Sequence, residues 1–185
     1  MKICVFLEGI NLEFPDIHIV NLGEKNNKGL SYSDTERKKL QNQLLLVNTL
    51  IDTVLTKVPQ KPIIVGIEGF AYGAKGNSLV DIVQTTGILK KTITDRLLDN
   101  NLAGLFIFSP SELKNAIGAK GNANKFDVFN QFIEDPKIEA AKDSALAQCL
   151  NKYSTELVTA SEIKSPFPDL VDSYLSVLKI YQALN

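Results

Sequence analysis

Apolar residues recur along this chain in two patterns, as short continuous runs and as rows at helical spacing. The continuous runs are rich in β-branched and aromatic residues, and they predict buried strands. "DIHIVNL" alternates apolar and polar residues after a break at Pro15, which predicts a further strand. The continuous runs are "KICVFLEGI" (Lys2–Ile10), "KPIIVGIEG" (61–69) and "GLFIFS" (104–109).

Segments with apolar residues every three or four positions predict the helices. The longest begins with Ser33 as its cap and Glu36 closing a capping box, and Pro59 marks its end. A shorter helix carries the same signature, with Ser109 as cap, a proline in the first position and Glu112 three residues on. The predicted helical segments are 33–58, 77–101, 109–118, the second half of 119–135, 136–153 and 166–184.

Helices that alternate with apolar strands predict an α/β layer fold. The first two strands are close in sequence and predict an antiparallel hairpin, whereas the later strands are joined through helices and predict parallel pairing. We therefore expect one mixed sheet flanked by helices. The chain has 185 residues, of which 44% are hydrophobic, so a single domain spanning 1–185 is expected.

The composition narrows the class of protein. Cys4 and Cys149 lie far apart and build no disulfide framework, which favours a reducing, cytoplasmic location. No apolar run is long enough to span a membrane, and the first residues lack a signal-peptide layout. His18 is the single histidine, which argues against histidine-based catalysis or metal binding. "GAKGNS" lacks the spacing of a phosphate-binding loop, so no nucleotide cofactor is expected.

Charge is distributed unevenly although the net charge is only −1. Between residues 73 and 125 there are seven Lys or Arg residues and four acids, which leaves this segment at about +3. Such a segment predicts either a local surface for phosphate contacts or ordinary solvated helix faces.

Three carboxylates carry the candidate chemistry. Asp169 and Asp172 are three residues apart near the start of the last helix, so both point the same way. By themselves they could simply complement the helix dipole. Glu68 ends a buried strand, where ligands bind in open α/β sheets. Three converging carboxylates repel one another unless a cation such as Mg²⁺ or Mn²⁺ offsets their charge, and two such ions suit phosphodiester cleavage.

Three segments together resemble the RuvC-type Holliday-junction resolvases of the ribonuclease H-like superfamily, most of all the compact forms encoded by bacteriophages. They are "VGIEGFAYGAKGNSLVDIVQTTGILKKTI", "FIFSPSELKNAIGAKGNANKFDVFNQF" and "FPDLVDSYLSVLKI". The resemblance implies a ribonuclease H-like fold with a helical insertion around 136–166, in the cytoplasm of a bacterium or of a phage-infected host. It also implies Mg²⁺ (with Mn²⁺ able to substitute), branched DNA as substrate, and a homodimer formed through the helix that contains "QTTGILKKTI".

The resemblance further implies four metal-binding acids, of which Glu68, Asp169 and Asp172 match. The fourth position holds Asn11, whose amide can lend an oxygen but no charge. Glu13 has the strand parity of Asn11 and could compensate, whereas Glu8 has the opposite parity. Three explanations stay open: a substitution introduced for study, a naturally reduced site, and a non-nuclease that kept the fold.

Two glycine-containing segments are candidates for DNA contact. In the first, glycines allow close backbone approach, a lysine can pair with phosphate and aromatic rings can stack on bases. In the second, lysines surround a flexible turn and suit phosphate contacts. The alternatives are a strand-to-helix turn with aromatic packing and a capped, solvated helix edge. The candidate residues are Phe70, Tyr72, Lys75, Asn77, Lys114, Lys120 and Lys125.

The sequence thus predicts a dimeric, Mg²⁺-dependent endonuclease for branched DNA, with a role in recombination and repair. Asn11, Glu68, Asp169 and Asp172 form its predicted metal site. One alternative is a non-catalytic DNA- or RNA-binding protein with the same fold. Another is a related nuclease that acts on RNA–DNA hybrids or genome-packaging intermediates.

Overall fold

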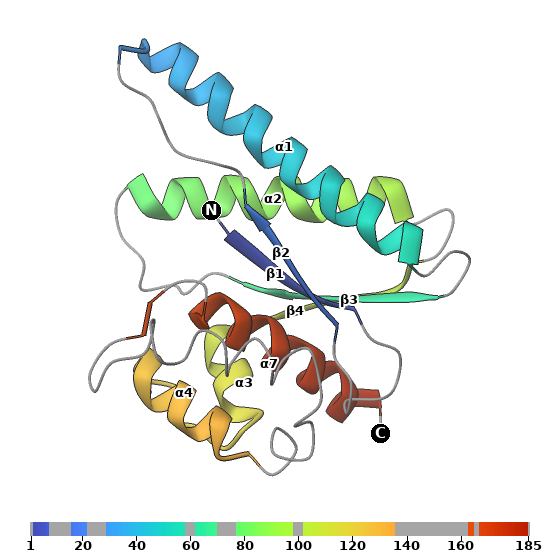
Figure 1. Ribbon diagram of the computed structural model, residues 1–185, viewed down its shortest axis with the longest axis vertical. Coiled ribbons are helices and arrows are strands. Elements are labelled where there is room, and N and C mark those ends of the chain that lie inside the picture. Colours follow the sequence, from blue (N-terminus) through green and yellow to red (C-terminus); the bar gives the residue numbers. More distant parts are fainter. Residues whose placement is uncertain are drawn as a thin grey trace. The chain divides into compact units, whose positions relative to one another are not determined.

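The computed structural model describes residues 2–7, 16–21, 29–57, 62–69, 77–97, 102–135, 163–164 and 167–184. Most of these residues lie in helices (Figure 1). The strands are β1 (Lys2–Leu7), β2 (Asp16–Asn21), β3 (Ile63–Glu68) and β4 (Leu102–Phe108). The helices are α1 (Tyr32–Lys57), α2 (Asn77–Leu97), α3 (Pro110–Asn115), α4 (Lys125–Ile133) and α7 (Phe167–Leu184).

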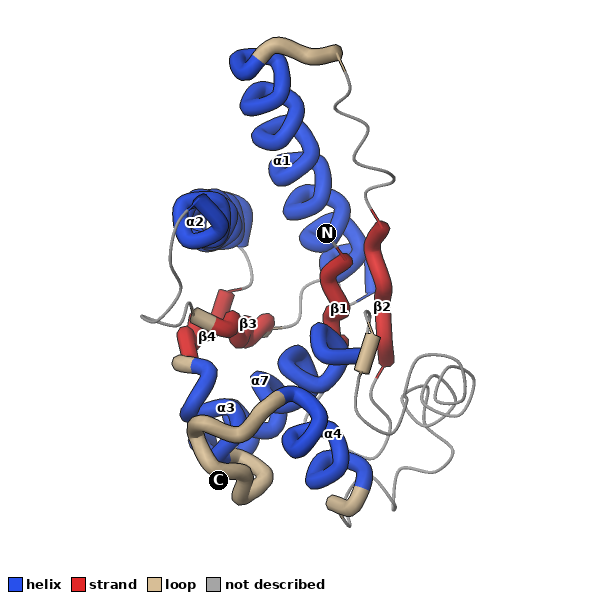
Figure 2. The backbone as a smooth tube through the Cα atoms, turned by 90° about the vertical axis from the view of Figure 1, so that its left-hand side faces the viewer, coloured by secondary structure: helices blue, strands red, loops and turns tan. Residues whose placement is uncertain are grey.

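The predicted fold class, a ribonuclease H-like mixed sheet, is wrong for the described residues. Their strands form two separate pairs, β1 with β2 and β3 with β4 (Figure 2). The second pair is parallel. The prediction fails at strand pairing because an apolar run indicates burial and does not specify which strand lies beside it. Here β1 lies against helix α7. The predicted insertion at 136–166 falls almost entirely outside the described residues.

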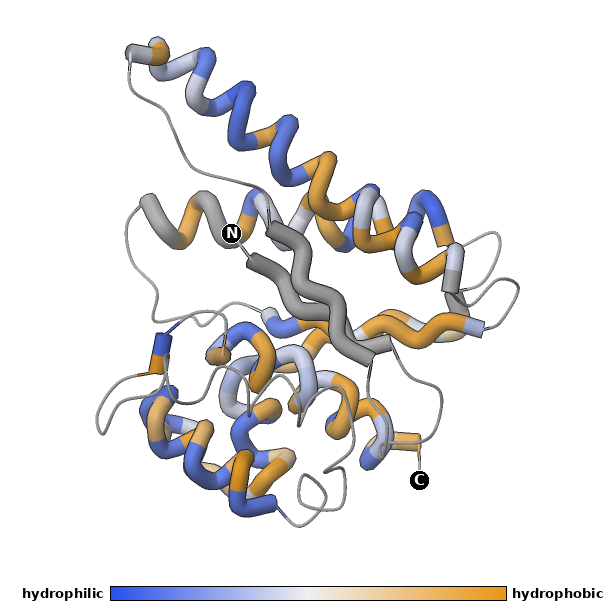
Figure 3. The backbone as a smooth tube through the Cα atoms, viewed as in Figure 1, coloured by the Kyte–Doolittle hydropathy of each residue, from blue (hydrophilic) through white to orange (hydrophobic). Residues whose placement is uncertain are grey.

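The described chain divides into two compact units. The first contains residues 20–65 and 70–105, and the second contains residues 2–19, 66–69 and 106–185. In the first unit α1 packs against α2. The N-terminal half of α1 is mostly hydrophilic, and apolar residues concentrate in its C-terminal half (Figure 3). Among the side chains of this helix pair that the structure describes, the buried ones are Leu46, Val47, Leu50, Ile51, Ile93 and Leu97.

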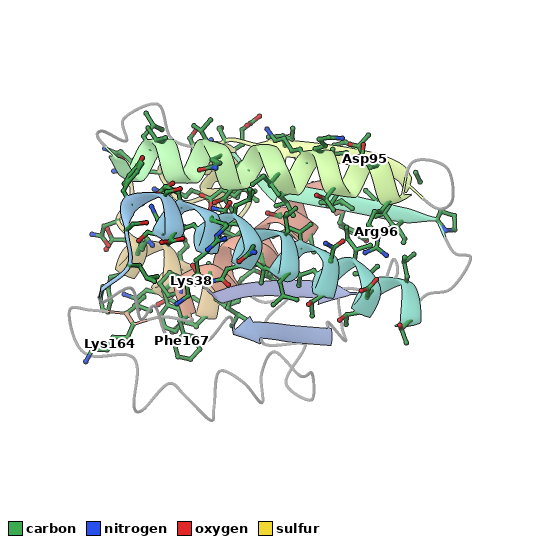
Figure 4. The ribbon with its side chains drawn as sticks, turned by 90° about the horizontal axis from the view of Figure 1, so that it is seen from above. Lys38, Asp95, Arg96, Lys164 and Phe167 are labelled. Atoms are coloured by element: carbon green, nitrogen blue, oxygen red, sulfur yellow. The ribbon has the colours of Figure 1, made fainter. Side chains whose placement is uncertain are left out.

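Polar contacts fix the pairing of α1 and α2. Figure 4 labels Arg96 of α2. Its guanidinium donates to Asn48 Oδ1 at 3.0 Å and to Asp52 Oδ1 at 2.8 Å. Gln43 Nε2 donates to Thr85 Oγ1 at 2.6 Å. Because both sets of contacts advance together along the two helices, α1 and α2 run parallel.

The N-terminal cap of α1 differs from the predicted one. Ser31, rather than Ser33, accepts the Asp34 backbone N–H at 3.1 Å and donates its hydroxyl to the Asp34 carboxylate at 2.7 Å. Both serines have an acid three residues on, so the spacing alone predicts either start. In contrast, the predicted capping box of Ser109 and Glu112 at α3 is confirmed.

The second unit is built around α7. Aromatic rings of α4 pack on it, with Phe129 5.6 Å from Phe167 and Phe132 5.2 Å from Tyr174 between ring centroids. Helix α3 also contacts α7. The apolar stripe of α7 is buried in this core and includes Phe167, Leu170, Val171, Tyr174, Leu175 and Leu178. None of the described helices is both long and apolar enough to cross a membrane.

Candidate functional site

Glu68 is the last residue of β3, and it belongs to the second unit. The next residue, Gly69, donates its backbone N–H to the Phe108 carbonyl at 2.7 Å. The ends of β3 and β4 therefore lie side by side. Side chains two residues apart on a strand share one face, so Glu68 points to the same side as Gly66.

Gly66 marks where that strand face meets α7. A Cβ atom added to Gly66 would stand 3.3 Å from the Cβ of Ser176 and 2.9 Å from the Cδ1 of Ile180. Ser176 lies one helical turn after Asp172, on the same face of α7. The charges of Asp172 and Asp169 act on Glu68, so the end of β3 lies on the Asp172 side of this contact.

Asp169 and Asp172 are both partly buried in the first two turns of α7. The buried residues Phe167, Leu170 and Val171 surround them in sequence and anchor this end of the helix in the core. The carboxylates therefore lie on the edge of a packed helix rather than on a loop. This rigid placement allows two acids to be held near a third despite their repulsion.

The pKa values of the carboxyl groups show that the acids interact. The pKa of Asp172 rises to about 6, mainly because burial disfavours its charge, with a further contribution from Asp169. The pKa of Glu68 rises to about 7, mainly because protein atoms crowd its carboxylate and also because of the charges of Asp172 and Asp169. Glu68 is an exposed residue, so solvent screens part of this effect. The charges of Asp172 and Asp169 oppose ionisation of Glu68.

Two lysines moderate this repulsion. Lys125 and Lys114 both lower the pKa values of Glu68 and Asp172, and Lys125 has the larger effect. Lys125 is the first residue of α4. The two ring contacts between α4 and α7 advance together along both helices, so the helices run parallel and their N-terminal ends are adjacent. This arrangement places Lys125 at the end of α7 that carries Asp169 and Asp172.

We call these five side chains the acid–lysine cluster: Glu68, Asp169, Asp172, Lys114 and Lys125. No protein-family model matches the chain, and no curated protein is detectably similar to it. The chemistry of this cluster is therefore the basis for assigning a function.

Lys114 has a structural role that the sequence did not reveal. Its ammonium donates to the Ala123 carbonyl at 2.7 Å and to the Gly121 carbonyl at 3.3 Å. These bonds tie α3 to the loop that leads into α4. The predicted contact of Lys114 with DNA stays a prediction. In the structure, the Lys114 ammonium binds two backbone carbonyls of the loop that precedes Lys125.

Replacing Lys114 by Met is expected to lower the free energy of unfolding by about 1–2 kcal/mol, because two backbone carbonyls lose a charged donor. Urea denaturation measures the change. Lys120→Met is the control, since Lys120 is exposed in the same loop. If the free energy of unfolding falls negligibly, and equally, in both variants, the loop does not depend on Lys114.

The acid–lysine cluster contains five of the predicted site residues, and the described structure does not test the place of the residues that follow. Asn11, Phe70, Tyr72 and Lys75 lie outside the described residues. Asn77 is the first residue of α2 and belongs to the first unit. Their predicted roles stay predictions.

The donor set suits a hard divalent cation, although the described residues do not enclose one. Within them, no group of three or more Asp, Glu, His or Cys side chains is close enough to hold a metal ion. Mg²⁺ commonly binds through one or two carboxylates and keeps several water ligands or substrate phosphate oxygens. Glu68 and Asp172 are two carboxylates that act on each other electrostatically, and a bound cation would relieve their repulsion.

Proposed function

We propose that this protein is a Mg²⁺-dependent endonuclease that cleaves the phosphodiester backbone of branched DNA, such as a four-way junction. The supporting observation is that the end of β3 and the start of α7 bring Glu68 within electrostatic range of Asp172 and Asp169, beside Lys125. The resemblance of three segments to junction resolvases points to the same chemistry. The proposal rests on this cluster and does not require the mixed sheet.

Each member of the acid–lysine cluster has a role in this proposal. Glu68 and Asp172 would hold Mg²⁺, with Asp169 reinforcing the negative potential, and the ion would supply activated water and stabilise the leaving oxygen. Lys125 is exposed at the start of α4 and would contact a backbone phosphate next to the carboxylates. Lys114 would keep the loop before α4 in place.

The phosphates of DNA would be the binding partners of the two lysines in the acid–lysine cluster. The excess of basic residues between positions 73 and 125 includes both cluster lysines, so phosphate contacts would dominate binding. Symmetric cleavage of a four-way junction needs two active sites, and we propose a homodimer on that ground.

The decisive experiment mixes the purified protein with a synthetic four-way junction, with and without Mg²⁺. We expect cleavage that depends on Mg²⁺, and we expect Asn11→Asp to increase its rate by adding a carboxylate. Linear duplex and an RNA–DNA hybrid of equal length test the preference for branched DNA. Absence of cleavage of every substrate by both chains would refute the nuclease proposal.

A second candidate, a non-catalytic nucleic-acid-binding protein, is favoured by two observations. Asn11 carries no charge at the expected fourth acidic position. The described carboxylates also do not form a three-ligand group. This candidate predicts salt-sensitive binding of a junction or RNA in a gel-shift assay, without cleavage even after Asn11→Asp.

A further inference from the structure

The close contact between β3 and α7 occurs at two small residues, Gly66 and Ser176. The backbone of Gly66 is not in the left-handed region, so its conformation does not demand glycine. What the position demands is space, because any Cβ there would press on Ser176 and Ile180. Glycine is otherwise unfavourable inside a strand, which makes its presence informative.

Ser176 is equally suited to a tight contact. It is buried, with 5% of its surface exposed, and its hydroxyl donates to the Asp172 carbonyl at 2.9 Å within its own helix. The hydroxyl therefore needs no partner on β3, and the side chain presents little more than its Cβ to the strand. Ser173 makes the corresponding bond to the Asp169 carbonyl at 2.8 Å but remains half-buried.

We infer that Gly66 and Ser176 are positioning residues, which set the spacing between Glu68 and the carboxylates of α7 by letting strand and helix approach closely. Glu68 lies two residues beyond Gly66, and Asp172 lies one turn before Ser176. A larger side chain at either contact would move both acids apart at once. The expected effect on metal binding rests on the proposed function. The expected effect on the spacing of the acids does not.

The test variant is Ser176→Val, which adds bulk at the contact. Ser176→Ala removes the same hydroxyl bond but keeps the contact small, and Ser173→Val makes the matched change outside the contact. Circular dichroism checks that each variant folds. If Ser176→Val does not fold, Gly66→Ala replaces it, because its methyl would stand 3.3 Å from the Cβ of Ser176, and the same direction of change is expected.

Two readouts separate spacing from function. The first is cross-linking by dibromobimane between Glu68→Cys and Asp172→Cys, in a chain with Cys4→Ser and Cys149→Ser. The second is Mn²⁺ affinity by calorimetry in chains that keep both carboxylates. We expect Ser176→Val to reduce the cross-linking rate and the Mn²⁺ affinity at least tenfold, and the two control variants to stay within twofold.

The outcomes distinguish the two proposals. If a folded Ser176→Val chain cross-links as fast as the same double-cysteine chain with Ser176 in place, the positioning inference is overturned. If cross-linking falls as expected but the wild-type chain binds no Mn²⁺, the positioning inference stands and the metal-dependent function fails. A Ser173→Val chain that loses as much as Ser176→Val would also overturn the inference, because the loss would then not come from the contact with Gly66.

Discussion

Replacing Asp172 by Asn is expected to reduce Mg²⁺-dependent cleavage of a four-way junction by at least about a thousandfold. Asn has nearly the same shape as Asp, so the helix should pack unchanged, while a charged oxygen ligand is lost. Glu68→Gln should have a comparable effect, because its carboxylate faces the same space from β3. Single-turnover cleavage rates measure both effects. The substitutions are made in the wild-type chain or in the Asn11→Asp chain, whichever is the more active.

The control for these variants is Glu134→Gln. Glu134 is an exposed acid at the end of α4 and does not contribute to the pKa shifts of the cluster. Its replacement removes one negative charge at a place where we propose no ligand. The cleavage rate should change less than about twofold. If Asp172→Asn and Glu68→Gln cleave at the same rate as Glu134→Gln, the acid–lysine cluster is not the active site.

The same two substitutions are expected to stabilise the protein at alkaline pH. In the folded state the pKa of Glu68 is about 7 and that of Asp172 about 6, whereas the ordinary values are 4.5 and 3.8. Between these limits the folded state binds more protons than the unfolded state, so the free energy of unfolding falls as the pH rises. The cost is absent below about pH 4 and fully present above about pH 7.

Urea denaturation at several pH values measures this effect in the Glu68→Gln/Asp172→Asn double variant. An amide resembles a protonated carboxyl group, so the double variant and the wild type should have equal stability near pH 4. At pH 8 the variant should be more stable by about 1–2 kcal/mol, a value reduced from the full shifts because solvent reaches both carboxylates. Addition of Mg²⁺ at pH 8 should narrow the difference by stabilising only the wild type.

If the difference in stability between the double variant and the wild type does not change between pH 4 and pH 8, the pKa shifts themselves are contradicted. A difference that grows with pH but does not respond to Mg²⁺ would leave the crowding of the acids intact and count against the proposed cation. The stability measurement therefore tests the cluster even if no substrate is cleaved.

Much of the local structure follows from short-range patterns in the sequence. Apolar runs and helical spacing located the described strands and helices, and the Ser109 capping box starts α3 as predicted. The pairing of Asp169 with Asp172 on one face of α7 is also a local property, because their spacing matches a helical turn. The predicted start of α1 at Ser33 was wrong, since Ser31 competes for the same role within a few residues.

Only the tertiary structure decided which elements meet. Hydrophobic patterns report burial, and burial can be satisfied by several neighbours, so the sequence by itself predicted a mixed sheet where the described strands form separate pairs. Likewise, the sequence marked Glu68 as a strand-end acid, but the close approach of Gly66 to Ser176 of α7 appears only in the tertiary structure. The sequence also does not reveal that the Lys114 ammonium donates hydrogen bonds to the carbonyls of Gly121 and Ala123. Such contacts join residues distant in sequence, and their energies depend on shape and distance, which no local pattern records.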